Sequence, residues 1–190
     1  HTLSSLFPKG MYGVSFTNGT KVLIYENNLA AMTQNVAALK TASYTTSGGG
    51  RWTGAGISAN TIILPETQFI LRNPSAQPLT LTLHGHVPDY SVSMLIAPNG
   101  DLVIGSGYPV PVVLKNSGLG ANLRKVLFYD NSAIGQNKAA VKTASYTTSG
   151  GGRWTGTGVT GNELILPGEM ITLRLPSSEA GAKITINKPY

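Results

Sequence analysis

Apolar and polar residues alternate in short runs along most of the chain, and glycine-rich turns separate these runs. The runs at 21–26 (KVLIYE) and 125–130 (KVLFYD) combine β-branched and aromatic residues, a composition typical of strands. Similar alternation returns at 79–85 (LTLTLHG) and 183–187 (KITIN). The pattern predicts an all-β fold, with room for a short helix at 29–39 and at 133–141.

The chain also contains an internal repeat. Residues 40–56 and 142–158 match at 16 of 17 positions with an offset of 102. The similarity weakens downstream, where seven of the next 18 positions match. We therefore predict two tandem, similar β-rich units, sandwich- or barrel-like and related by a pseudo-twofold. They span residues 1–86 and 107–190, with a connector at 87–106, and form either two domains or one fused domain.

Each copy carries the signature of a β-hairpin, because a Gly-rich turn separates the runs TASYTT and RWTG. A three-residue loop at 47–49 would set Tyr44 opposite Trp52 and place Arg51 on the other face. One interpretation is that the rings form a cross-strand pair in the core. The other is that they stack on sugars while the arginines bind carboxylate or sulfate. Under this second interpretation the binding residues are Tyr44, Arg51, Trp52, Tyr146, Arg153 and Trp154.

Composition narrows the class of protein. Hydrophobic residues make up 41% of the 190 residues, enough for a core, and no apolar run is long enough for a transmembrane helix. The absence of Cys excludes disulfides, thiolate zinc sites and cysteine nucleophiles. Fourteen Lys and Arg against eight Asp and Glu give a net charge of +6, which favours anionic partners such as acidic glycans or nucleic acid.

Several short motifs are shared by the two copies and by a known group of proteins. In the first copy they are Gly49–Trp52, Leu64-Pro65 and Arg72-Asn73-Pro74; in the second, Gly151–Trp154, Leu166-Pro167 and Arg174, preceded by Pro109–Val112 and Asn116–Leu119. In these motifs the chain resembles an uncharacterised family of exported proteins from Verrucomicrobia, a phylum that includes mucin-degrading gut bacteria. The resemblance covers roughly residues 8–187.

The chain departs from that family at two points. The order Arg-Trp replaces Trp-Arg in each hairpin, which would exchange the two side chains across the strand. Leu175 stands where the family has Asn. The resemblance implies duplication and a secreted or envelope-exposed location, and it implies no chemistry. Residues 1–5 lack the basic and apolar segments of a signal peptide.

Glu26 and Asp130 occupy equivalent positions in the two copies. Two carboxylates that share one proton are the machinery of an acid protease, so this pair is the candidate catalytic site of a metal-independent hydrolase. The sequence around them lacks the Asp-Thr/Ser-Gly motif of those enzymes. A capping or turn role at the end of each strand explains the same residues.

His84 and His86 lie two residues apart on a predicted strand, with Asp89 close behind. They form a weak candidate for a zinc site, which needs a third ligand and an orienting shell. Solvent-facing strand residues are the alternative explanation. We expect no cofactor.

These observations lead to a function prediction with three alternatives. We expect an exported protein that binds an extracellular anionic polymer, best matched by mucin-type glycoprotein, through its duplicated aromatic and arginine hairpins. The alternatives are a carboxylate-dependent hydrolase of the same material (protease-like, or a glycosidase), a structural surface protein, and a nucleic-acid binder.

Overall fold

The computed structural model describes residues 1–7, 15–25, 37–63, 67, 69–81, 87–96, 98–130 and 139–190. It confirms an all-β chain, in which short antiparallel strands predominate and α1 (Leu3–Leu6) is a single helical turn. The chain divides into two compact units, with the described residues up to 81 in the first unit and those from 87 onward in the second.

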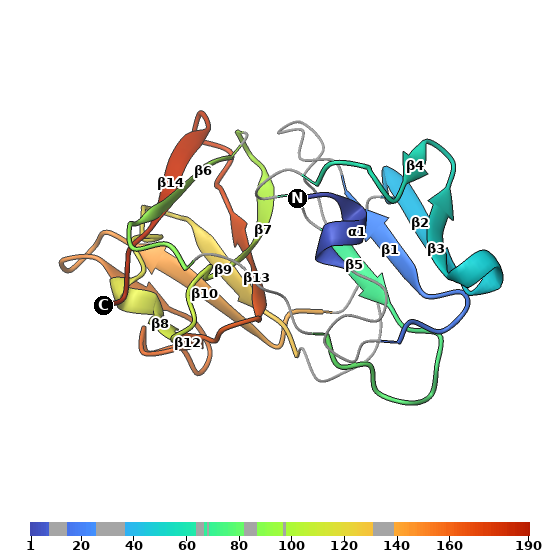
Figure 1. Ribbon diagram of the computed structural model, residues 1–190. Coiled ribbons are helices and arrows are strands. Elements are labelled where there is room, and N and C mark those ends of the chain that lie inside the picture. The colour runs from blue at the N-terminus through green and yellow to red at the C-terminus, as the bar shows by residue number, and fades with distance from the viewer. Residues whose placement is uncertain are drawn as a thin grey trace. The chain divides into compact units, whose positions relative to one another are not determined.

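The first unit is built on one five-stranded antiparallel sheet, whose order is β4-β3-β2-β1-β5 (Figure 1). Helix α1 and Phe7 contribute to the core of this unit. The strands are β1 (Lys21–Ile24), β2 (Lys40–Thr45), β3 (Arg51–Gly54), β4 (Ile57–Ser58) and β5 (Phe69–Arg72).

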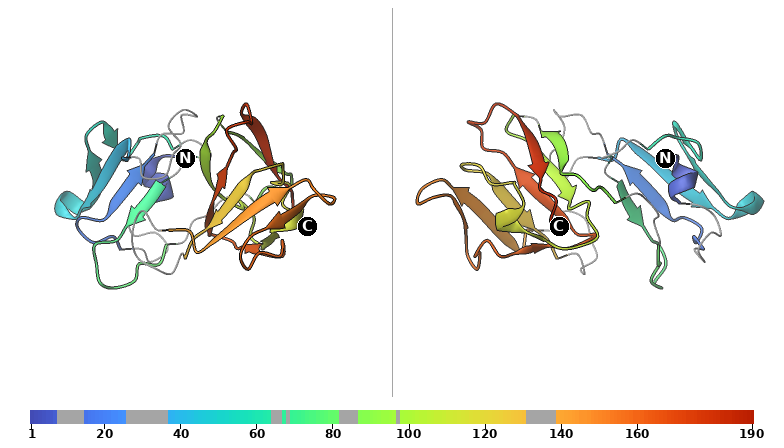
Figure 2. Two further views of the ribbon diagram at one scale, coloured as in Figure 1. Left: turned by 180° about the vertical axis from the view of Figure 1, so that it is seen from behind. Right: turned by 60° about the vertical axis from the view of Figure 1, so that its left-hand side comes forward.

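The second unit surrounds one core with three sheets (Figure 2). The largest has the order β11-β10-β9-β13-β7, and two further pairs, β12-β8 and β14-β6, complete the enclosure. The strands are β6 (Val92–Ile96), β7 (Asp101–Gly105), β8 (Val112–Val113), β9 (Lys125–Phe128), β10 (Lys142–Thr147), β11 (Arg153–Thr155), β12 (Leu164–Ile165), β13 (Met170–Arg174) and β14 (Ala182–Ile186).

The sequence repeat reappears as an identical strand register. Lys21 lies opposite Ser43 on one side and Arg72 on the other, and Lys125 lies opposite Ser145 and Arg174 in the same way. Strands β1, β2, β3 and β5 therefore correspond to β9, β10, β11 and β13. How the two units are related in space stays a prediction.

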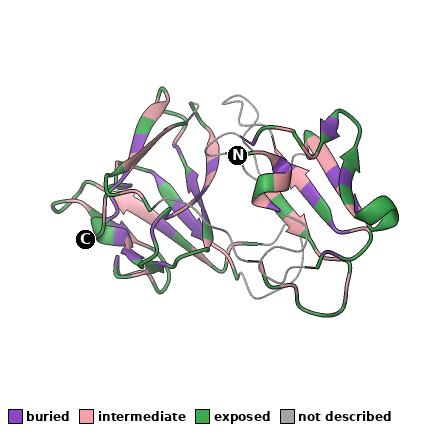
Figure 3. Cartoon of the chain, viewed as in Figure 1, coloured by how far each residue is buried: buried purple, intermediate pink, exposed green. Residues whose placement is uncertain are grey.

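Period-two alternation explains how each sheet forms a core. Val22 and Ala42 lie opposite one another and are fully buried, and the equivalent pair Val126 and Ala144 is fully buried as well. Their strand neighbours are more accessible: Lys21 is exposed and Ser43 is partly buried. Figure 3 shows buried residues alternating with more accessible ones along the strands. One face of each strand thus provides the hydrophobic stabilisation, about 25 cal/mol for each Å² of apolar surface removed from water.

The structure corrects two sequence predictions. Residues 87–106 are not simply a connector, because they contain β6 and β7, which pair with β14 and β13. The hairpin loop spans residues 46–50 rather than 47–49, because Gly48, Gly49 and Gly50 all have positive φ and the ladder ends at Thr45 and Arg51. The helices predicted at 29–39 and 133–141 fall largely outside the described residues.

Candidate functional site

The two hairpins place their aromatic rings in the cores. Tyr44 lies opposite Trp52, as predicted, with ring centroids 5.2 Å apart and a T-shaped arrangement. Both residues are only 5% exposed, and Trp52 Nε1 donates a hydrogen bond of 3.2 Å to the carbonyl of Phe7. Trp154 is likewise 5% exposed and packs against Tyr146 at 5.1 Å. Buried rings cannot stack on a sugar, so Tyr44, Trp52 and Trp154 are core residues rather than the binding residues that the sequence predicted.

Tyr146 is the most accessible of the four rings, and a single substitution between the copies explains the difference. In the first unit Phe16 packs against both Tyr44 and Trp52, at 5.3 and 5.2 Å between centroids. The second unit has Gly120 at the equivalent position, and a Cβ there would lie 2.5 Å from the Tyr146 ring. Tyr146 therefore packs against bare backbone and is only half-buried.

The opposite side of each hairpin is polar and accessible. We call this surface the hairpin face; it consists of two cations and three hydroxyl residues from the outer side of three adjacent strands. Thr53 Oγ1 donates to the Ser43 carbonyl at 3.4 Å, and Thr155 repeats this bond to the Ser145 carbonyl at 3.1 Å. The members are Lys21, Ser43, Thr45, Arg51 and Thr53 in the first unit and Lys125, Ser145, Thr147, Arg153 and Thr155 in the second.

Charge pairing distinguishes the hairpin arginines from Arg124 and Arg174. Arg174 makes two hydrogen bonds of 2.7 Å to the Asp101 carboxylate, and Arg124 is bound by Glu179 through Nε at 3.1 Å. Within the described residues, Arg51 and Arg153 have no such carboxylate and both are exposed. Each guanidinium is therefore available to an external anion in a planar, two-point geometry.

The structure describes only one of the two carboxylates in the predicted catalytic pair. Glu26 lies outside the described residues, whereas Asp130 is exposed just beyond β9 and takes part in an interaction of its own. A catalytic role for Glu26 and Asp130 stays a prediction.

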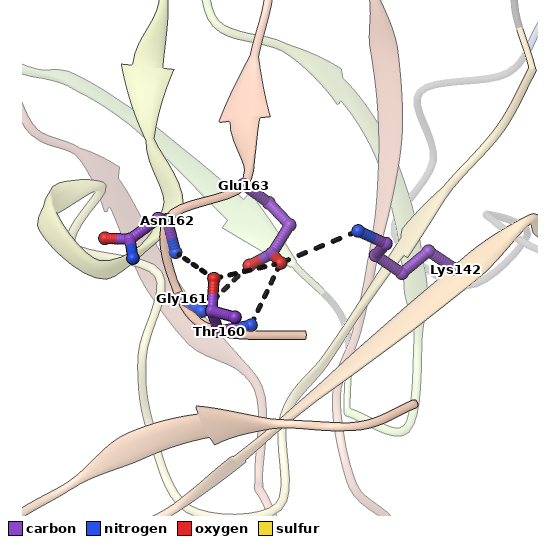
Figure 4. Close-up of polar contacts among 5 residues, drawn as sticks. All are labelled: Lys142, Thr160, Gly161, Asn162 and Glu163. Carbon is purple, nitrogen blue, oxygen red and sulfur yellow. Dashed lines mark hydrogen bonds and ion pairs between the residues drawn. The ribbon is translucent and has the colours of Figure 1, made fainter. Parts of the chain in front are cut away.

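No sequence motif predicts the role of Glu163, a carboxylate that holds a turn in the second unit. Glu163 bridges the turn before β12, accepting hydrogen bonds from the backbone N–H groups of Thr160 at 3.0 Å and Gly161 at 2.8 Å (Figure 4). Lys142 Nζ lies 3.6 Å from the same carboxylate, whose side chain is 9% exposed. Thr61 holds the equivalent position in the first copy, where its hydroxyl accepts from the Ser58 N–H at 2.9 Å.

The electrostatic surroundings of Glu163 mark it as a structural residue. Burial alone would raise the pKa of its carboxyl, but the backbone hydrogen bonds from Thr160, Glu163 itself and Gly161, with the charge of Lys142, lower it overall. A general acid requires the opposite shift, a pKa raised toward the working pH. Glu163 is therefore a turn clamp rather than a proton donor.

The histidine candidate for a metal site also lies mostly outside the described residues. His84 and His86 lie outside the described residues, whereas Asp89 is described and is exposed to solvent. Among the residues that the structure does describe, no group of three His, Asp or Glu is arranged to hold a metal ion. No helix in the same part of the chain is long and apolar enough to cross a membrane.

Accessible aromatic rings do occur, in the second unit, where the sequence analysis had not placed them. Tyr90 and Tyr190 are both well exposed, and Lys188 Nζ lies 4.9 Å from the Tyr190 ring centroid. Buried Tyr108 links them, because its hydroxyl donates to the Tyr90 carbonyl at 2.9 Å and its ring packs edge-on against Tyr190. We call this group the tyrosine cluster.

The lysines of the hairpin faces were not among the binding residues predicted from the sequence. Lys21 and Lys125 lie outside the nearly identical segment, and their offset of 104 differs from the offset of 102 within it. The usable signal was the matching KVL at the start of each strand, which fixes the register and brings the lysines beside Ser43 and Ser145.

Comparisons of the chain with protein-family models, with curated proteins and with solved structures give no match.

Proposed function

We propose that this protein binds an acidic extracellular polymer, in the class of sulfated or sialylated mucin-type glycans, through its two hairpin faces. One observation carries the proposal. Both sheets present the same two cations and the same three hydroxyl residues in the same register, and the arginines have no carboxylate partner among the described residues. An exported location follows from the resemblance described above and belongs to the proposal.

The chemistry of the hairpin face favours a glycan over a nucleic acid. Guanidinium and ammonium groups attract sulfate or carboxylate, while Ser and Thr hydroxyls exchange hydrogen bonds with sugar hydroxyls. Binding to single-stranded nucleic acid relies on aromatic platforms for the bases, and the hairpin rings are turned into the core. Arg51 lies two strands away from Lys21 and two residues further along its strand, so their backbones are about 12 Å apart. Each face can therefore contact more than one acidic group.

Two faces on one chain also suit a polymer better than a small anion. A repetitive ligand that engages one face raises the effective concentration of its next acidic group at the other. The expected result is tight binding to long chains and weak binding to single sugars.

The test compares binding of immobilised sulfated mucin by the intact protein and by the variant Arg51→Ala plus Arg153→Ala. Loss of one two-point contact in each face should weaken binding by at least about tenfold per arginine, or ~1.4 kcal/mol. Salt at about 0.5 M should abolish most of the remaining affinity, because exposed charges are screened within a few ångströms. The matched control is Lys115→Ala plus Lys183→Ala, which removes the same charge from exposed positions outside both faces.

The proposal fails if the arginine variant binds like the unmodified protein, or if the lysine control loses as much affinity. Binding that survives high salt would also contradict it. If the protein binds single-stranded DNA more tightly than both sulfated and desulfated mucin, the ligand is a nucleic acid and not a glycan.

A further inference from the structure

The two sheets differ at one edge. In the second unit β13 lies between β9 and β7, so both of its edges are hydrogen-bonded. The equivalent strand of the first unit, β5, pairs with β1, and no described residue pairs with its other edge. Within the part of the chain that the structure describes, the backbone N–H and C=O groups on that edge therefore have no strand partner, and such an edge can accept a further strand.

Strand β7 shows the chemistry that fits such an edge. Asp101 lies opposite Arg174 and binds it through both carboxylate oxygens at 2.7 Å. Leu102 and Ile104 lie opposite Leu173 and Ile171 and are buried with them in the core. Strand β7, which pairs with this edge of β13, thus combines a carboxylate at one end with apolar residues at alternate positions.

Among the described residues, β5 has no carboxylate partner and no strand on its outer edge. Phe69 and Leu71 pack against the core of the first unit but are only partly buried, whereas their equivalents beside β7, Ile171 and Leu173, are almost fully buried. Arg72 lies opposite Lys21, a pair of like charges that weakens a sheet, and no described carboxylate offsets it. In the second unit the same pairing of Arg174 with Lys125 is offset by Asp101.

We infer that the outer edge of β5 binds an extended segment of a partner polypeptide, which adds to the first sheet as an antiparallel strand. The register of β7 on β13 specifies the segment: an acidic residue opposite Arg72, then apolar residues opposite Leu71 and Phe69. A second copy of the chain does not fit through its own β5, because the sequence Phe69–Arg72 contains no acid to face Arg72.

The test uses the chain's own example of such a strand as a probe. A capped peptide with the sequence of residues 99–107 is titrated into the intact ¹⁵N-labelled protein, and amide signals are followed by NMR. We expect shifts and slower amide exchange at Phe69–Arg72, and no change at the occupied strand Met170–Arg174. Replacing Asp by Lys in the peptide should weaken binding about tenfold or more.

A charge exchange separates strand addition from unspecific association. The variant Arg72→Glu should prefer the Lys peptide over the Asp peptide, reversing the order seen with the unmodified protein. If that variant does not fold, the comparison of the two peptides on the unmodified protein still decides.

Three results would overturn the inference. One is the absence of any change at Phe69–Arg72 up to about 1 mM peptide, the weak end of specific binding. Another is equal affinity for the Asp and Lys peptides. The third is a concentration-dependent dimer that the peptide dissociates, which would make a second copy of the chain the occupant.

Discussion

Single residues account for several local differences between the two copies. Where the first copy has Thr61, the second has Glu163, and the short hydroxyl cap is replaced by a carboxylate that binds two backbone N–H groups and Lys142. The exchange converts a neutral turn into a charged one whose stability depends on pH.

We predict that Glu163→Gln lowers the free energy of unfolding at pH 7 by about 1.5–3 kcal/mol, the range for hydrogen bonds to a charged group. The folded pKa of this carboxyl lies below its usual value of 4.5, so its contribution is complete above that pH. It is lost as the pH falls through the lowered folded pKa.

Chemical denaturation of both proteins at pH 7 and near pH 3 measures the effect. The difference between the unmodified protein and the variant should shrink at the lower pH. As a control, Asp89→Asn at an exposed position should change the unfolding free energy by less than about 0.5 kcal/mol. A difference for Glu163→Gln that grows as the pH falls would contradict the sign.

A second exchange concerns backbone strain. Gly19 has φ +86° and donates its N–H to the Tyr44 carbonyl, and Leu123 makes the same bond to Tyr146 with φ +63°. A left-handed conformation is easily adopted by glycine and costs a branched side chain about 1 kcal/mol or more.

We therefore predict that Leu123→Gly raises the thermal midpoint of the second unit, because Leu123 is 57% exposed and contributes little to the core. The reverse change, Gly19→Ala, should destabilise the first unit by about 1 kcal/mol although space for a Cβ is available. Calorimetry of both variants checks the pair; a lower midpoint for Leu123→Gly would show that its side chain matters more than its backbone.

At the scale of the element, each hairpin has two faces with different tasks. The inner face carries Tyr44 and Trp52 into the core, and the outer face presents Arg51 among hydroxyls. Neighbouring positions on one strand, Arg51 and Trp52, should therefore respond to substitution in opposite ways.

We predict that Trp52→Ala destabilises the protein by about 3–5 kcal/mol, the cost of a large cavity in a core. Arg51→Ala should stay within about 0.5 kcal/mol in stability, since it is exposed and unpaired among the described residues, yet weaken glycan binding. Urea denaturation and mucin binding measured on the same samples separate the two effects. Large destabilisation by Arg51→Ala would place the arginine in the fold rather than in the binding surface.

The hairpins show which structural features could be predicted from the sequence. Period-two alternation and the glycine turn were enough to predict the Tyr44–Trp52 pairing and the face on which Arg51 lies, because both are local. The sequence predicts a connector where β6 and β7 lie, because it does not show their partners, β14 and β13, which lie about 70 to 90 residues away in the chain. Period-two alternation indicates which face of a strand is buried, but not which distant strand it pairs with.

Candidate chemistry was harder to predict for the same reason. The alternation at Tyr44 and Trp52 favoured a buried pair but left a sugar platform open, and the positions of Phe7 and Phe16 around the rings decide for the core. Glu163 follows a turn without any motif, and its role depends on Lys142, which arrives from another strand.

At the scale of the whole molecule, duplication is the dominant feature. Two units with separate cores repeat the same four strands in the same register, and the face repeated with them is cationic and rich in hydroxyls. Such repetition matches a ligand that repeats as well. The sheets differ at one edge, because β7 pairs with β13 whereas no described residue pairs with the corresponding edge of β5.

The most direct measurement is an NMR map of a short sulfated oligosaccharide on the intact protein, recorded at low and at high salt. We expect shifts at the hairpin faces of both units, centred on Arg51 and Arg153, with loss of the shifts as salt rises. Shifts confined to the tyrosine cluster around Tyr90 and Tyr190 would show that a different surface binds the sugar. No shifts at either place would contradict glycan binding by this protein.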